Sequence, residues 1–437
     1  GSVTVSSGGA IDLNTYTVAN ALSLSGTGYN SSGALYNSHA STGASASGTI
    51  TLAAATTIIN SGSGTLTLSG TMNGANALTV TNTGSVAFNG VVGGTTALSS
   101  LSVSGPATLG ANVTTSGTQT YTGAVTLGNN VSLVTTAGAT TGANISFGNT
   151  ITGSAPTRNL TLDAGTAGAI SVTGTIGTNI GTLTVTNSGG ATFTGAVTTG
   201  TSVVLTNTTG TIAFNGALIT PTLSTYAQAY NLGLNATGTT ITNAISFLNT
   251  GTLGLGSSSG TQTYTGGLVA TAPSSVSIAG TIAASGTGVI TLGDADTAVT
   301  VSANSTVGGA STGTITLGST TLVDGVTLII GAGAITPINL TAVAGTANGS
   351  ASHLTINTLG ALAVSSTIGT DIGTLTITNS GGATFTGAVT AGTSVVLTNT
   401  TGTIAFNGAL TTPTLTTAAN AYNLGLNATG TTITNAV

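Results

Sequence analysis

Charged residues are almost missing from this 437-residue chain. It has one Arg, six Asp and neither Lys nor Glu, so charged residues make up 2% of the sequence, against about 25% in ordinary globular domains. Nucleic acid is excluded as a partner, since phosphate recognition needs Lys and Arg. Acid–base catalysis requires paired titratable groups, and few pairs are available here. We therefore expect a protein that is not an enzyme and uses no cofactor.

Cysteine, tryptophan and long apolar runs are also lacking. Without Cys there is neither a disulfide nor thiolate chemistry. No window reaches the roughly 20 apolar residues that a transmembrane helix needs, so we expect no membrane span in this segment. The stability of the fold must then come from stacked hydrogen bonds and packing.

What the chain does contain is a repeat. Residues 181–244 recur with six conservative differences as residues 373–436, a block displaced by 192 positions. A finer spacing of 21 separates Phe193 from Phe214 and Phe385 from Phe406, and Phe88 lies five such steps before Phe193. Steps of about 19–24 residues are typical of the coils of a β-solenoid. Both ends of the chain fall where a longer chain or fibre would continue, so we interpret it as a fragment.

Short alternating runs of aliphatic residues and Thr, bounded by Gly, Asn and Ser, predict strands and turns throughout. We predict an all-β fold, a parallel β-helix (β-solenoid) forming an elongated rod of about 20 coils, roughly 100 Å long at ~4.8 Å per coil. Residues 1–80 are predicted to form less regular coils and residues 81–437 the repetitive solenoid. Aliphatic and Phe side chains should face inward, and Thr, Ser and Asn outward. The predicted core residues are Phe88, Leu183, Val185, Phe193, Leu205, Ile212, Phe214, Phe385 and Phe406.

Two stretches resemble known families. Residues 23–92 resemble the strand repeats of autotransporter passengers, and the segments SGTQTYTGAVTL at 116–127 and SGTQTYTG at 259–266 resemble repeats of filamentous-haemagglutinin-like large exoproteins. Both resemblances imply right-handed parallel β-helices on or outside bacterial surfaces, used for adhesion, aggregation or matrix building. The expected location is extracellular or on the bacterial cell surface.

Asp294 and Asp296 are the only close pair of carboxylates. In a strand this spacing would put both on one face, which makes them a candidate Ca²⁺ site. After Gly293, a turn with two solvated carboxylates is the competing interpretation.

The remaining candidates are isolated. Tyr121 and Tyr264 could stack on sugars or fill the interior of a coil. Arg158 could pair with Asp163, and neither His39 nor His353 has neighbouring metal ligands in the sequence.

Together these patterns predict a non-catalytic structural protein of the bacterial cell exterior, a stretch of an extracellular fibre, sheath or adhesin stalk. We expect it to associate with itself end to end or laterally, and host or matrix glycans are further candidate partners. One alternative is an ice- or glycan-binding solenoid that uses Thr-x-Thr faces, such as Thr79–Thr81 and Thr184–Thr186. Another is a functional amyloid.

Overall fold

The computed structural model describes residues 1–435, which belong to two compact units, Gly1–Gly216 and Ala217–Val437. Ala436, the last residue of the predicted repeat, and Val437 lie outside the described residues. The chain is nearly all β, with 1% helix, and its parallel strands form a β-solenoid of about 20 turns. The predicted fold class is thus confirmed. Among residues 1–435, the one helical segment is a 3₁₀ turn, η1 (Tyr29–Ser31).

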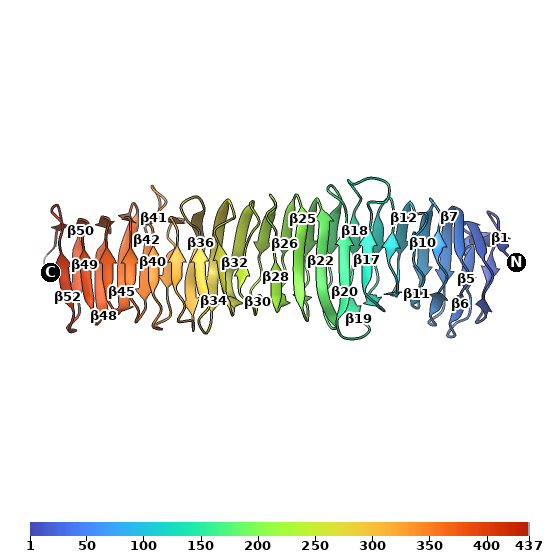
Figure 1. The fold of residues 1–437 in the computed structure, drawn as a ribbon, viewed down its shortest axis with the longest axis horizontal. Helices are drawn as coiled ribbons and strands as arrows, with labels where there is room; N and C mark the ends of the chain where they lie inside the picture. Colours follow the sequence, from blue (N-terminus) through green and yellow to red (C-terminus); the bar gives the residue numbers. More distant parts are fainter. Residues whose placement is uncertain (436–437) are drawn as a thin grey trace. The chain divides into compact units, whose positions relative to one another are not determined.

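In the first unit, each turn contributes backbone to three parallel ladders, and most strands pair with the strand one turn before and one turn after (Figure 1). The first ladder consists of β1 (Val3–Val5), β4 (Leu22–Gly26), the start of β7 (Ile50–Asn60), β9 (Met72–Asn73), Val92, β14 (Val113–Thr114), β17 (Val131–Val134), β20 (Arg158–Asp163), β22 (Ile180–Ser188) and β25 (Ser202–Thr208).

The second ladder consists of β2 (Ile11–Asp12), β5 (Leu35–Asn37), the end of β7, β10 (Ala77–Asn82), β12 (Ser100–Val103), β15 (Gln119–Tyr121), β18 (Ile145–Phe147), β21 (Ala169–Val172), β23 (Gly190–Phe193) and β26 (Thr211–Phe214). The third consists of β3 (Thr17–Val18), β6 (Ala44–Ala46), β8 (Leu66–Leu68), β11 (Val86–Phe88), β13 (Ala107–Leu109), β16 (Val125–Leu127), β19 (Ile151–Gly153), Ile176 and β24 (Val197–Thr198).

The second unit repeats this plan. Its first ladder begins with β28 (Thr222–Ser224), followed by β31 (Ile245–Ser246), β33 (Gly267–Ala270), β35 (Val289–Leu292), β37 (Ile315–Leu317), β40 (Ile338–Leu340), β43 (Leu362–Val364), β46 (Ala383–Phe385), β49 (Thr403–Phe406) and β52 (Asn423–Leu426).

Three long strands of this unit pass through both remaining ladders: β32 (Thr252–Tyr264), β34 (Ser275–Ala284) and β36 (Ala298–Gly309). The second ladder is completed by β29 (Asn231–Leu234), β38 (Thr320–Leu322), β41 (Val343–Gly345), β44 (Ile368–Gly369), β47 (Val389–Thr390), β50 (Leu410–Thr412) and β53 (Thr432–Ile433). The third is completed by β27 (Leu218–Thr220), β30 (Thr240–Ile241), β39 (Thr327–Ile330), β42 (Ser352–Asn357), β45 (Ile372–Ser380), β48 (Ser394–Thr400) and β51 (Thr414–Thr417).

The length of a turn varies with its loops. Within the repeated block, Phe193 pairs with Phe214 and Phe385 with Phe406, a step of 21 residues in each case. The step shortens to 18 between Leu101 and Gln119. It lengthens to 29 between Val131 and Leu160, because the loops on either side of β18 and β19 are longer there. The predicted step of about 19–24 residues describes the regular turns, and the length of the loops accounts for the shorter and the longer ones.

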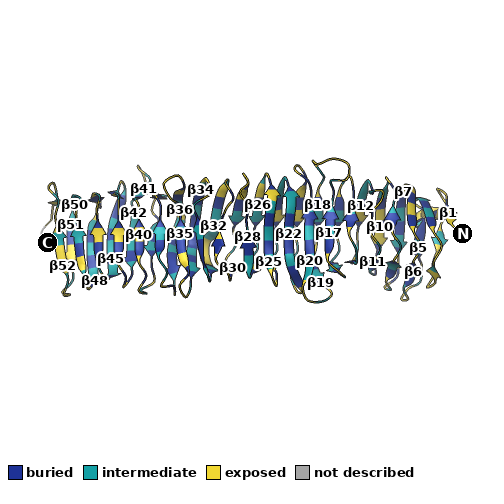
Figure 2. Cartoon of the chain, viewed as in Figure 1, coloured by how far each residue is buried: buried dark blue, intermediate teal, exposed yellow. Residues whose placement is uncertain are grey.

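Side chains alternate between the interior and the surface along most strands, as Figure 2 shows by its alternating colours. This is the period-two pattern of a pleated strand. The nine residues predicted from the sequence to form the core are all at most 1% exposed, namely Phe88, Leu183, Val185, Phe193, Leu205, Ile212, Phe214, Phe385 and Phe406. In-register pairing places the buried side chains of successive turns on top of one another, so the hydrophobic interior is continuous along each unit.

Residues 1–80 join the same ladders as the residues that follow. Their longer loops carry exposed aromatic side chains, Tyr16 before β3 and Tyr29 in η1, which are 72% and 68% exposed. A column of buried amides closes one corner: Asn37 Nδ2 donates to Asn60 Oδ1 over 3.2 Å, and Asn60 Nδ2 donates to the carbonyls of Gly64 and Ser85. Buried polar groups of this kind are tolerated because each has a hydrogen-bond partner.

Candidate functional site

Titratable side chains do not gather into a site in the described part of the chain. Among residues 1–435, no group of three or more His, Cys, Asp or Glu side chains is placed to hold a metal ion. The second unit instead contains a hydroxyl-lined groove of about 320 Å³ that crosses β32, β34, β36 and β39. This groove is the strongest candidate for a functional site.

A bulge in β32 forms one wall of the groove. The pairing of β32 with β34 is interrupted between Gly256 and Thr261, so the residues between them have no partner in β34. Ser258, Ser259 and Gly260 are exposed at this position. A bulge bends its strand and re-aims neighbouring side chains, and here it places two serine hydroxyls beside the regular strands.

Gly280 allows the bulge to lie close against β34. Its φ of 70° lies in the left-handed region, which favours glycine. A Cβ atom at this position would lie 2.7 Å from the carbonyl oxygen of Ser257 and 2.8 Å from that of Gly260. The wall of the groove therefore depends on the absence of a side chain at residue 280.

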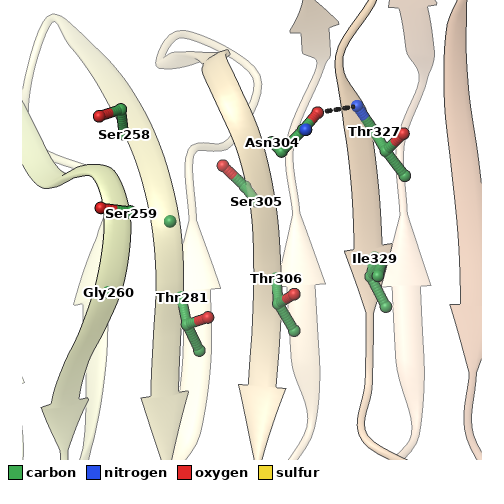
Figure 3. Close-up of a pocket in the computed structure, with 10 residues that line it drawn as sticks. Ser258, Ser259, Gly260, Thr281, Asn304, Ser305, Thr306, Thr327 and Ile329 are labelled. Carbon is green, nitrogen blue, oxygen red and sulfur yellow. Dashed lines mark hydrogen bonds between the residues drawn. The ribbon is translucent and has the colours of Figure 1, made fainter.

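The floor of the groove is formed by one outward-facing position on three successive strands. Thr281 of β34 pairs with Thr306 of β36, and Thr306 pairs with Ile329 of β39. Figure 3 shows these side chains one beside the next, with Asn304 and Thr327 at the neighbouring position. The lining residues are Ser258, Ser259, Gly260, Gly280, Thr281, Asn304, Ser305, Thr306, Thr327 and Ile329.

Hydrogen bonds hold part of this lining in place. Ser257 Oγ donates to the carbonyl of Ser259 over 2.7 Å, which braces the bulge. Asn304 Oδ1 accepts from the backbone N–H of Thr327 over 2.8 Å, so its Nδ2 group is left to face the groove. The side-chain hydroxyls of Thr281, Thr306 and Thr327 have no hydrogen-bond partner within residues 1–435.

The groove is uncharged. Its lining offers hydroxyl and amide groups, which both donate and accept hydrogen bonds, together with the half-buried apolar side chain of Ile329. Such a surface has no group to act as an acid, a base or a nucleophile activated by one. It is suited to reversible binding of a neutral, polar molecule.

The candidate Ca²⁺ residues Asp294 and Asp296 lie in the turn between β35 and β36 rather than in a strand. Oδ1 of Asp294 accepts from the backbone N–H groups of Asp296 and Thr297, over 3.0 and 2.9 Å. This carboxylate therefore closes its own turn, as Asp side chains commonly do. Both carboxylates are exposed, which is the arrangement of the competing interpretation.

The suggestion that Tyr121 and Tyr264 form sugar-stacking platforms is wrong. Their exposed fractions are 1% and 0%, because each sits on the inward side of its strand. Their hydroxyl groups donate to Gln119 Oε1 and Gln262 Oε1, respectively. Tyr121 also stacks on Phe147, with ring centroids 5.1 Å apart, so these tyrosines fill the core.

The other isolated candidates are not gathered into a metal site within residues 1–435. His39 Nδ1 accepts from the backbone N–H groups of Ser41 and Thr42, and His353 lies in β42. Oδ1 of Asp163 accepts from Gly165 N–H and from Asn187 Nδ2. Arg158 and Asp163 are the first and last residues of β20, about 16 Å apart along an extended strand, so the pairing considered from the sequence is wrong. The guanidinium Nε of Arg158 is buried without a hydrogen-bond partner in the described residues.

Thr-x-Thr motifs do contribute to outward-facing columns of side chains, and these columns contain both Ser and Thr. On the second ladder of the first unit, one outward position is occupied in seven successive turns by a hydroxyl residue, namely Thr57, Thr79, Ser102, Thr120, Ser146, Ser171 and Thr192. The next residue in this column is Ala213. The face is thus hydroxyl-rich, with Ser and Thr interspersed.

Sequence reasoning missed the groove. The available signal was the run Ser257–Ser258–Ser259–Gly260, which interrupts the alternation of apolar and polar residues between Leu255 and Gln262. A Gly beside such an interruption suggests a bulge. The depth of the groove also depends on β36 and β39, which lie two and three turns away from β32, and no local pattern reveals this.

Within residues 1–435 no helix has the length and hydropathy needed to cross a membrane. Comparisons with protein-family models, with curated proteins and with solved structures gave no match. The chain is a β-helix repeat protein by its fold.

Proposed function

We propose that this chain is a non-catalytic structural protein of the bacterial cell exterior, serving as a stretch of a surface fibre, sheath or adhesin stalk. The observation that carries the proposal is the set of three parallel ladders in each unit, which stack around a continuous aliphatic interior. A stack of this kind provides length and stiffness, because each turn satisfies the backbone hydrogen bonds of its neighbours.

The uncharged surface supports the same proposal. Six Asp and one Arg in 437 residues leave few titrating groups whose ionisation is coupled to folding. Salt also has few ion pairs to screen. A protein outside the cell meets changing salt and pH, and this composition makes its stability insensitive to salt and to moderate changes of pH.

The resemblance of residues 23–92, 116–127 and 259–266 to autotransporter passengers and to filamentous-haemagglutinin-like exoproteins supports the extracellular location. Lateral or end-to-end association with further copies is the corresponding expectation for partners. It follows from the sparsely charged outer faces, since a formal net charge of −5 spread over 437 residues leaves only weak repulsion between copies.

Two measurements test the proposal. Electron microscopy of negatively stained native protein should show stiff, extended particles or filaments, and surface proteolysis of intact producing cells with a protease that cleaves after uncharged residues should degrade or release the chain. Flexible or compact particles, or a chain that is protected until the cells are lysed, would contradict it. A control protein of the cytoplasm should stay intact during the surface proteolysis.

A further inference from the structure

We propose that the groove in the second unit is a binding site for a neutral oligosaccharide. Thr281, Thr306 and Thr327 present hydroxyls with no partner in the described part of the chain, and Asn304 presents an amide held by its own bond to Thr327. Sugar hydroxyls, like these groups, both donate and accept.

The apolar part of the floor suits a sugar ring as well. Ile329 occupies the same outward position as Thr281 and Thr306, at the end of the row of hydroxyls. A pyranose ring has an apolar C–H face and a rim of hydroxyl groups. The C–H face could pack on Ile329 while the rim forms hydrogen bonds with the threonines. The groove volume of about 320 Å³ lies within the range of small-molecule sites.

Charge and topology disfavour other ligands. No charged side chain lines the groove, so an anionic polymer or a phosphate would lack a counter-charge. A peptide that binds as an added strand needs an open sheet edge. Here β34 and β36 are paired with a strand on both sides along most of their length.

The column of residues that contains Thr281 and Thr306 also shows which substitutions the fold should tolerate in a test of the site. It continues through Ile329, Thr355 and Thr376 to Val396. β-branched apolar residues already occupy this outward position at Ile329 and Val396. Replacing Thr by Val there removes a hydroxyl and keeps the shape, so such variants should fold.

The experiment uses the full chain and four probes: cellotetraose, maltotetraose, chitotetraose with its N-acetyl groups, and a heparin-derived tetrasaccharide. Saturation-transfer NMR identifies the probes that bind, and calorimetry gives their affinity. We expect at least one neutral probe to bind. The double variant Thr281→Val/Thr306→Val should bind it about tenfold more weakly, the loss expected for two hydrogen bonds. The matched variant Thr376→Val, which lies outside the groove, should bind as the wild type does.

A second variant tests the binding site independently, in case the double variant misfolds. Asn304→Asp keeps an oxygen to accept from Thr327 N–H and removes the two N–H donors, so it too should weaken binding of the neutral probe. The proposal is overturned if no neutral probe binds, if only the heparin fragment binds, or if Thr376→Val weakens binding as much as the groove variants. Any of these results would leave the proposed structural role intact, because that role does not depend on a ligand.

Discussion

Phe193 and Phe214 stack face to face in the interior of the first unit, with ring centroids 4.7 Å apart and ring planes within 10°. Phe385 and Phe406 form the same pair in the second unit, at 4.7 Å and 5°. In each pair the two residues are direct partners in the parallel ladder. The repeat in the sequence therefore corresponds to a repeated packing contact, in which the side chains of one turn pack against those of the next.

The stacked rings should be a major source of stability. Replacing Phe406 by Ala removes a side chain that is 0% exposed, which should destabilise the protein by about 3–5 kcal/mol. Urea unfolding monitored by circular dichroism would measure the loss. Thr384→Ala, in the partner strand but exposed, is the control and should change little. Equal effects of the two substitutions would mean that the pair does not stabilise the fold.

The buried amide column should tolerate little change. Asn60 is 0% exposed, and its Nδ2 group donates to the carbonyls of Gly64 and Ser85 over 2.7 and 3.0 Å. In Asn60→Ala those carbonyls lose a donor inside the corner, at a cost of about 1–3 kcal/mol for each group left unsatisfied. Thermal unfolding of this variant can be compared with that of Asn129→Ala, which removes an exposed bond to Gly110. A melting temperature as high for Asn60→Ala as for the control would contradict the role assigned to the column.

The buried tyrosines should make stability fall in alkali. Burial raises the pKa of Tyr230 to about 12 from an ordinary value of 10.0, and it raises the pKa of Tyr121 and of Tyr264 further. The folded state then binds these protons more tightly than the unfolded state does. Their contribution to stability is complete below pH 10 and is lost as the pH rises above it.

Absorbance at the tyrosinate band measures this directly. At pH 11 the native protein should show fewer than its eight tyrosines ionised, and unfolding in guanidinium should increase the signal. The variant Tyr121→Phe, which retains the ring, should reduce that increase. An unchanged signal on unfolding would show that these phenols are accessible in the folded protein.

The turn at Asp294 should require a side-chain oxygen at residue 294 as a hydrogen-bond acceptor, and it should not require a bound cation. Asp294→Asn keeps an acceptor for Asp296 and Thr297 and should be nearly neutral, whereas Asp294→Ala should lose about 0.5–1.5 kcal/mol. Calcium or EDTA should leave the melting temperature of the wild type unchanged. A clear rise with calcium that disappears in Asp294→Asn would instead establish the cation site.

The single Arg allows a proteolytic test of the ladders. Arg158 lies in β20, which is paired with β17 and β22, and the chain has no Lys. Trypsin needs an extended, accessible backbone, so the native protein should remain intact and the unfolded one should yield two fragments. Rapid cleavage of native protein at Arg158, detected by mass spectrometry, would show that this part of the ladder opens.

The sequence by itself determined the class of fold and the interior. Alternation of Val, Leu, Ile and Phe with Thr and Ser is a local property, and it assigns Leu183, Val185 and Phe193 to the inside wherever the strands pair. The spacing of Phe193 and Phe214 also determined the step of the regular turns, since side chains that stack must recur once per turn. The near absence of charge also predicts, without any structure, that nucleic acid is not a partner.

Only the tertiary structure decided which side chains of separate turns meet. It turned Tyr121 and Tyr264 inward, which alternation alone left open, and it placed Asp294 in a turn. It also brought Ser259, Thr281, Thr306 and Ile329 together into one groove, because a bulge in β32 and the glycine at 280 shift the register of a corner. Register across turns depends on loops of variable length, and that dependence is not contained in any single stretch of the chain.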